Sequence, residues 1–152
     1  MTKTRFETDL ARHTIVGLDT AVLIYHLDDT KPYSTLTESA FTAIAAGRPV
    51  AVVSTISLAE LLVKPYADNR LDRAAAIEAF LGSVPNVRLV APPAGAAREA
   101  ARLRARYGLR MPDALVVATA KSEGAGAVVT NDRDLRRVKG EGLSVLVLSD
   151  YT

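Results

Sequence analysis

The stretch Thr14-Ile15-Val16-Gly17-Leu18-Asp19-Thr20 decides the fold of this chain. Its apolar residues leave no regular polar face, which predicts a strand buried on both sides. The strand ends at Asp19, and the apolar run over residues 21–25 continues as a helix with Thr20 as its predicted N-cap. Asp19 is therefore expected at the carboxyl end of a first parallel strand, where open α/β sheets bind their ligands.

The same patterns place the other elements outward from this stretch. Further strands are predicted at residues 49–54, 87–90, 127–130 and 144–148, and helices at residues 20–27, 36–44, 55–66, 77–84, 96–107, 112–123 and 135–139. Strands that alternate with helices predict a parallel sheet with helices on both faces. The length of 152 residues suits one domain over residues 1–152. The polar residues 1–13 are expected to form a flexible arm.

The amino-acid composition limits which kinds of metal site and binding partner the protein can have. Hydrophobic residues make up 49% of the chain, which is enough for a packed core. The chain has no cysteine and only two histidines, so a metal site would have to use mainly oxygen ligands. The net charge of +2 permits a nucleic-acid partner without demanding one. No apolar run approaches the ~18 residues of a membrane span, so we expect a cytoplasmic protein with no membrane partner.

Four acidic residues follow strands or lie near the starts of helices: Asp19, Glu60, Asp113 and Asp132. If the fold brings them to one edge of the sheet, their charges repel and need a compensating cation. Carboxylate oxygens suit Mg²⁺ or Mn²⁺. The sequence therefore predicts a magnesium or manganese site.

Each of these residues also has a simpler role. Asp19 and Asp132 could merely cap the helices that follow them. Glu60 could complete a capping box with Ser57, although an unpaired charge within its apolar segment is costly. Asp113 could merely interact with its helix dipole, worth roughly 0.3–1 kcal/mol. These alternatives stay open at this point.

A second group of polar residues lies near the same strand ends: Asp134, Thr20, Thr130 and Asn131. They could orient a ligand or a water, and turn, cap or surface roles are at least as common. Arg98, Arg102 and Arg106 form an i, i+4, i+8 stripe. Such a stripe is usually a solvated face, so we expect it to matter little to the fold, with RNA contact as the alternative.

The acidic positions lie in four segments: Leu18-Asp19-Thr20, Ser57-Leu58-Ala59-Glu60-Leu61, Met111-Pro112-Asp113-Ala114 with Ala118-Thr119-Ala120, and Thr130-Asn131-Asp132-Arg133-Asp134-Leu135. Together these segments resemble the PIN-domain ribonucleases, and specifically the VapC-type toxins of bacterial type II toxin–antitoxin systems. Each motif alone is weak. Four of them in the family's order, spread over nearly the whole chain, make the resemblance specific.

The resemblance implies a PIN-like three-layer α/β/α sandwich with a parallel sheet of about five strands in the order 3-2-1-4-5. It implies that Asp19, Glu60, Asp113 and Asp132 bind Mg²⁺ or Mn²⁺ and cleave RNA, with Asp134 at an acidic position that varies in the family. It also implies a homodimer and a cognate antitoxin whose tail packs on helices and blocks the pocket.

Other functions compete with this one. The chain could be a catalytically silent PIN-like module that binds RNA or protein. An aspartate-nucleophile phosphatase also has an aspartate after its first strand, but it resembles Asp-x-Asp, and here Ala21 stands at the second position. A receiver-like domain that holds one Mg²⁺ would need a second early acidic residue and a late lysine near the pocket, and neither is obvious.

Overall fold

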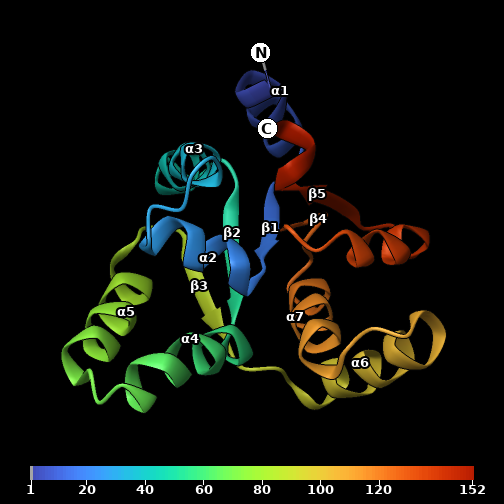
Figure 1. Ribbon diagram of the computed structural model, residues 1–152. Coiled ribbons are helices and arrows are strands. Elements are labelled where there is room, and N and C mark those ends of the chain that lie inside the picture. Colours follow the sequence, from blue (N-terminus) through green and yellow to red (C-terminus); the bar gives the residue numbers. More distant parts are fainter. Residues whose placement is uncertain (1) are drawn as a thin grey trace.

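A five-stranded parallel sheet forms the centre of the computed structural model, which describes residues 2–152 (Figure 1). The strands are β1 (Ile15–Leu18), β2 (Val50–Ser54), β3 (Val87–Val90), β4 (Ala127–Thr130) and β5 (Ser144–Val147). They lie in the order β3-β2-β1-β4-β5, and every neighbouring pair is parallel. The predicted strands and the order implied by the family resemblance are both confirmed.

Helices cover both faces of this sheet, as the alternating pattern predicted. They are α1 (Thr2–Ala11), α2 (Thr20–Leu27), α3 (Tyr33–Ala45), α4 (Thr55–Ala67), α5 (Leu71–Ser83), α6 (Ala94–Tyr107) and α7 (Met111–Ser122), with the 3₁₀ helices η1 (Arg133–Glu141) and η2 (Leu148–Tyr151). The short basic helix predicted at residues 135–139 is thus the middle of η1. None of the helices within residues 2–152 has both the length and the apolar character needed to cross a membrane.

Alternate side chains of the strands enter two separate cores. Val16 and Leu18 of β1 pack on one face of the sheet, in the core that includes α1, α2, α3 and α5. Val128 of β4 packs in the other core, with α6, α7 and η1. On that face α7 comes very close to β1, because a Cβ added at Gly17 would lie 2.6 Å from Ala120 Cβ. The absence of a side chain at Gly17 therefore sets how closely the helix that carries Asp113 approaches the sheet.

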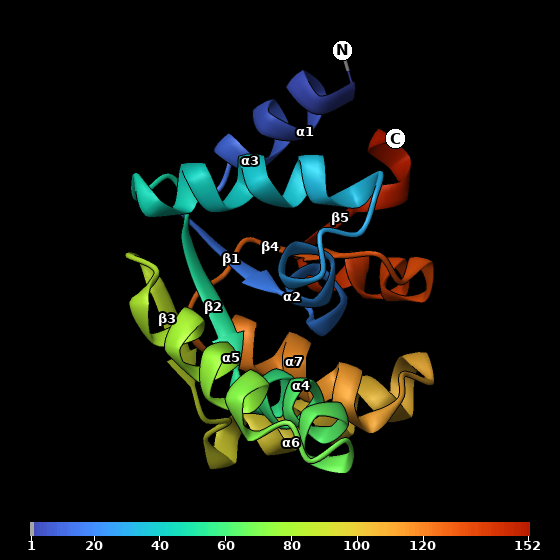
Figure 2. The same cartoon turned by 60° about the vertical axis from the view of Figure 1, so that its left-hand side comes forward.

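The prediction of a flexible arm is wrong for residues 2–11, which form α1, while Met1 lies outside the described residues. Phe6 and Leu10, one helical turn apart, are 0% and 2% exposed. The ring of Phe6 meets that of Tyr151 edge-on at 5.1 Å, and Tyr151 donates a 2.8 Å hydrogen bond to Asp9. Figure 2 shows α1 beside α3 and the C-terminal end of the chain. The arm is thus part of the packed domain.

Candidate active site

Asp19 lies at the centre of the candidate site, directly after β1. The residue is 6% exposed, and its backbone N–H continues the sheet by donating to the carbonyl of Val129 at 3.0 Å. One carboxylate oxygen accepts from the backbone N–H of Thr20 at 2.8 Å and the other from Thr130 Oγ1 at 2.7 Å. Asp19, rather than the predicted Thr20, is therefore the N-cap of α2. The capping role uses only one of its two oxygens.

The environment of Asp19 disfavours its charged form. Burial raises the pKa of this carboxyl, and the carboxylates of Glu60 and Asp132 raise it further. The hydrogen bonds from Thr130 and Thr20 oppose that rise without cancelling it. A buried carboxylate whose charged neighbours are also acidic is a common feature of functional sites.

Asp132 is joined to Asp19 through Thr130. The Thr130 hydroxyl donates to Asp19 and accepts from the backbone N–H of Asp132 at 3.0 Å. Asp132 Oδ1 accepts from the backbone N–H of Asp134 at 2.9 Å, so Asp132 is the N-cap of η1. The simple capping role is confirmed for Asp132, and its second oxygen takes no part in the cap.

Glu60 reaches the site from α4. Thr20 Oγ1 lies 2.9 Å from both Glu60 Oε1 and Ser57 Oγ. The N-cap of α4 is Ser54, whose hydroxyl accepts from the backbone N–H of Ile56 at 3.1 Å. The prediction of a capping box between Ser57 and Glu60 is therefore wrong, because Ser57 lies inside the helix rather than at its start.

Asp113 lies in the first turn of α7, with 18% of its side chain exposed. Burial and then the charge of Asp19 raise its pKa to about 6, and Asp132 and Glu60 add to the rise. Arg110 Nε, 4.0 Å from Asp113 Oδ2, opposes it. A helix-dipole role alone would lower the pKa, so burial and the charges of the other carboxylates outweigh it here. Arg110 was not identified from the sequence, although its i, i+3 spacing from Asp113 was a readable signal.

The four carboxylates thus act on one another without forming a tight cluster. Within residues 2–152, no three acidic or histidine side chains are gathered closely enough to form a ready metal-binding group. The donor chemistry still fits a hard cation, because every candidate ligand is a carboxylate oxygen. The electrostatics fit as well, since a cation would relieve the repulsion that raises the pKa of Asp19 and Asp113.

Of the second group of polar residues predicted near the strand ends, two contact the acidic residues of the site and two do not. Thr20 and Thr130 bond directly to acidic residues of the site. Asn131 instead links structural elements, because its amide donates to Tyr25 Oη at 3.1 Å and its oxygen accepts from the backbone N–H of Ser149 at 2.9 Å. Asp134 is 69% exposed and pairs with Arg137 at 3.5 Å, as a surface charge would.

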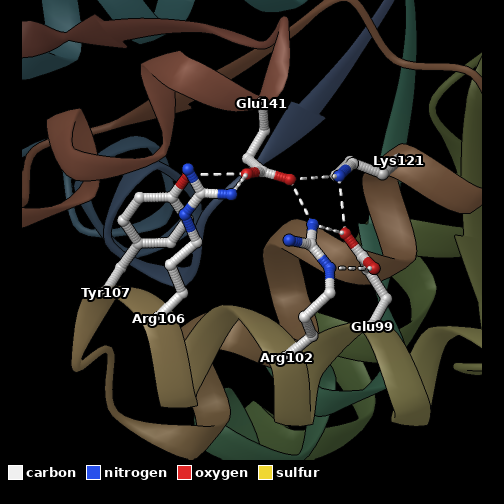
Figure 3. Close-up of polar contacts among 6 residues, drawn as sticks. All are labelled: Glu99, Arg102, Arg106, Tyr107, Lys121 and Glu141. Atoms are coloured by element: carbon white, nitrogen blue, oxygen red, sulfur yellow. Dashed lines mark hydrogen bonds and ion pairs between the residues drawn. The ribbon is translucent and has the colours of Figure 1, made fainter.

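The arginine stripe on α6 is not the inert solvated face expected from its spacing. Arg102 binds Glu99 and Glu141, and Arg106 Nη1 lies 3.7 Å from Glu141 Oε2 (Figure 3). The expectation that these side chains matter little to the fold stays a prediction, and the ion pairs of Arg102 and Arg106 are evidence against it. Arg98 is exposed, and no ion pair involves it within residues 2–152.

Solved structures share this fold. A chain of VapBC2 from Rickettsia felis, bound to a DNA fragment from its promoter, is 20% identical with a TM-score of 0.69, covering 86% of this chain and 96% of that chain. A chain of VapBC-5, a toxin–antitoxin system of Mycobacterium tuberculosis, is 26% identical with a TM-score of 0.59, covering 88% and 98%. VapC20 of Mycobacterium tuberculosis, a toxin that cleaves the sarcin–ricin loop, is 18% identical with a TM-score of 0.58, covering 74% and 86%.

Sequence comparison gives the family. None of the curated proteins matches this chain at a significant level. A sequence model of the PIN domain matches residues 16–141, from the first residues of β1 to the end of η1. That match includes all four acidic positions and leaves α1, β5 and η2 outside it. Because the match covers far more than half of the sequence and the strand order agrees with it, this chain belongs to the PIN domain family.

Proposed function

We propose that this protein is a metal-dependent endoribonuclease and the toxin of a toxin–antitoxin pair. The observation that carries the proposal is the arrangement of the acidic residues: Thr130 joins Asp19 to Asp132 by hydrogen bonds, and Thr20, next to Asp19, binds Glu60. Burial and the repulsion of these carboxylates raise the pKa of Asp113 to about 6. A catalytically silent module would have no need to keep such repulsion. The solved VapBC structures with the same fold, and VapC20 as an RNA-cleaving toxin, support the assignment.

The residues that would hold Mg²⁺ or Mn²⁺ are Asp19, Asp113, Asp132 and Glu60. When bound, the ion would lower the pKa of a water and stabilise the leaving oxygen of the phosphodiester. Thr130 holds the carboxylate of Asp19 in place, and Thr20 does the same for Glu60. Because the four side chains are not tightly gathered, they would have to move closer together to hold one ion.

The substrate would approach over the exposed side of this site. Arg110 is 73% exposed beside Asp113, and it can bind a phosphate once a metal ion neutralises that carboxylate. Arg98, exposed on α6, is a further candidate for phosphate contact. Such contacts weaken with salt, and sequence preference would rest on single-stranded or looped RNA.

A groove next to the site is our candidate for the partner surface. A groove of about 510 Å³ between α2, α4 and α5 reaches Glu60 and is lined by apolar side chains such as Ile24, Leu61 and Ile77, with Lys64 and Arg73 among its charged residues. A cognate antitoxin tail bound there would cover Glu60 and block access to the carboxylates. A homodimer is part of the same proposal.

The test is cleavage of labelled RNA by the purified protein with Mg²⁺ or Mn²⁺, with excess chelator, and by Asp19→Asn. Metal-dependent cleavage that Asp19→Asn loses supports the proposal. RNA binding without cleavage would favour the silent module. Metal-dependent hydrolysis of a phosphate monoester, without RNA cleavage, would favour a phosphatase.

A further inference from the structure

Glu141, the last residue of η1, lies at the centre of a charge network outside the candidate site (Figure 3). Its side chain is 8% exposed, and its carboxylate accepts from Tyr107 Oη at 2.6 Å and Lys121 Nζ at 3.3 Å. Arg102 also donates to it, and Arg106 lies nearby. The side chain thus ties the end of η1 to both α6 and α7.

Glu99 forms the other half of this network without touching η1. Arg102 donates to both of its oxygens, at 3.0 and 2.7 Å, and Lys121 Nζ donates to it at 2.6 Å. Hydrogen bonds from these cations lower the pKa of Glu99 to about 2, and those from Arg102 and Tyr107 do the same for Glu141. Both glutamates are therefore ionised at neutral pH, and of the two only Glu141 lies on η1.

η1 has reason to need an anchor at each end. It is a 3₁₀ helix of nine residues, whereas 3₁₀ runs beyond 3–4 residues are uncommon because their hydrogen bonds have poorer geometry. Leu135 and Val138 are its buried side chains. Its first turn is fixed by the cap at Asp132, and its last residue by the network around Glu141. Between its ends, Arg137 donates to the carbonyl of Tyr107 at 3.2 Å, while Arg133 and Arg136 bind Ser149 and Asp150 of η2. Among these polar ties, the contacts of Glu141 and Arg137 are the ones that hold η1 to α6 and α7.

We propose that Glu141 is a positioning residue for Asp132. By holding the end of η1 against α6 and α7, it fixes the orientation of the 3₁₀ helix whose N-cap is Asp132. The orientation of η1 decides where the second oxygen of Asp132 points, because Asp132 Oδ1 is bound to the backbone N–H of Asp134 in its first turn. The role of Asp132 as a metal ligand rests on the proposed function.

The test compares Glu141→Gln with Glu99→Gln. The two variants remove equivalent charges from one network, and only the first loosens η1. Hydrogen exchange of the Asp134 amide, followed by NMR in the metal-free protein, reports whether the Asp132 carboxylate is still held. We expect Glu141→Gln to raise this exchange rate about tenfold and Glu99→Gln to leave it within about twofold of wild type.

Titration with Mn²⁺ alone, followed by melting temperature, supplies the second measurement. We expect Glu141→Gln to weaken Mn²⁺ binding ~10-fold, as loss of support for a ligand does, and Glu99→Gln to leave it unchanged. If Glu141→Gln fails to fold, Tyr107→Phe replaces it, because it removes one donor to Glu141. We expect Tyr107→Phe to raise the Asp134 exchange rate and to weaken Mn²⁺ binding, each by less than Glu141→Gln would.

Equal effects of the two glutamine variants on Asp134 exchange, or no effect of either, would overturn the positioning role. The proposed function fails separately, if wild-type protein neither binds Mn²⁺ nor cleaves RNA with it. In that case the exchange measurement still shows whether Glu141 holds Asp132.

Discussion

Two groups of carboxylates in this protein have opposite electrostatics. Burial and neighbouring acids raise the pKa of Asp19 and Asp113 in the candidate site. In the network on α6, hydrogen bonds from cations and Tyr107 lower the pKa of Glu99 and Glu141 to about 2. The side chains are chemically alike, so the difference comes from what the fold places beside them.

The two groups share secondary-structure elements. α7 carries Asp113 in its first turn and Lys121 in its last turn, and η1 runs from its cap at Asp132 to Glu141. At the C-terminal ends of α7 and η1, Lys121 and Glu141 belong to a network whose charges are balanced within the protein. At their N-terminal ends, Asp113 and Asp132 lie among carboxylates whose charges are not balanced. The unbalanced end is therefore where we expect a cation from outside the protein to bind, since functional sites often keep interactions that oppose stability.

The largest expected effect comes from removing a charge at the unbalanced end. Asp19→Asn and Asp113→Asn should lower the rate of RNA cleavage by about 10²–10³-fold, because metal-supplied stabilisation of the transition state is worth several kcal/mol. Asp134→Asn is the matched control, since Asp134 is exposed and paired with Arg137. Cleavage rates at saturating Mn²⁺ decide the matter, and an active Asp113→Asn protein would show that the site is wrongly assigned.

The next effect is on stability. Mn²⁺ at a hundred times its dissociation constant should stabilise the folded protein by about 2.7 kcal/mol, which raises the melting temperature by roughly 5–10 °C. Without metal, Asp113→Asn should melt at the same temperature as wild type or higher, because it removes one of the mutually repelling charges. Thermal melts with and without Mn²⁺ measure both. A clear loss of metal-free stability in Asp113→Asn would favour a helix-dipole role for Asp113.

The sequence was informative about the sheet and the acidic edge because both depend on local pattern. The apolar run that ends at Asp19 predicts a buried strand and its carboxyl end, and Pro112 predicts the start of the helix that carries Asp113. The closeness of the four carboxylates depends on side-chain rotamers, which no spacing reveals. The sequence therefore predicted which four acidic residues face one another, but it could not predict that their side chains would not be tightly gathered.

The elements that the sequence missed are held by distant residues. α1 has only two buried apolar side chains in a polar segment, and the partner of Phe6 is Tyr151, at the far end of the chain. Arg102 and Glu141 are 39 positions apart, so the stripe on α6 resembled an ordinary solvated face. Helical spacing shows which residues share a face and cannot show what packs against it.

The pH dependence of metal-free stability separates the two groups of carboxylates. The pKa of Asp113, about 6 in the folded protein, lies above its ordinary value of 3.8, so its protonation stabilises the fold as pH falls from 7 towards 4. Glu99 and Glu141 have a folded pKa of about 2, so their contribution is present above about pH 4.5 and is lost below it. The combined contribution of these three carboxyls to stability should therefore be largest at about pH 4–5, and denaturant unfolding of wild type and variants across pH measures it. Asp113→Asn should reduce the change in unfolding free energy between pH 7 and pH 4. Glu141→Gln should reduce the loss of stability below about pH 4.5.

The smallest effect concerns the α6 stripe itself. Arg102→Gln should lower the melting temperature, because it leaves Glu99 and the nearly buried Glu141 with fewer donors. Arg98→Gln should change the unfolding free energy by less than about 0.5 kcal/mol, since the side chain is exposed and no ion pair involves it in the described part of the chain. Melting temperatures at low and high salt distinguish Arg102→Gln from Arg98→Gln. Salt should weaken the network and so reduce the difference in melting temperature between the two variants. If Arg98→Gln also reduces the salt dependence of RNA binding while leaving the fold intact, Arg98 contacts phosphate. Equal melting temperatures for the two variants would show that the network contributes nothing to stability.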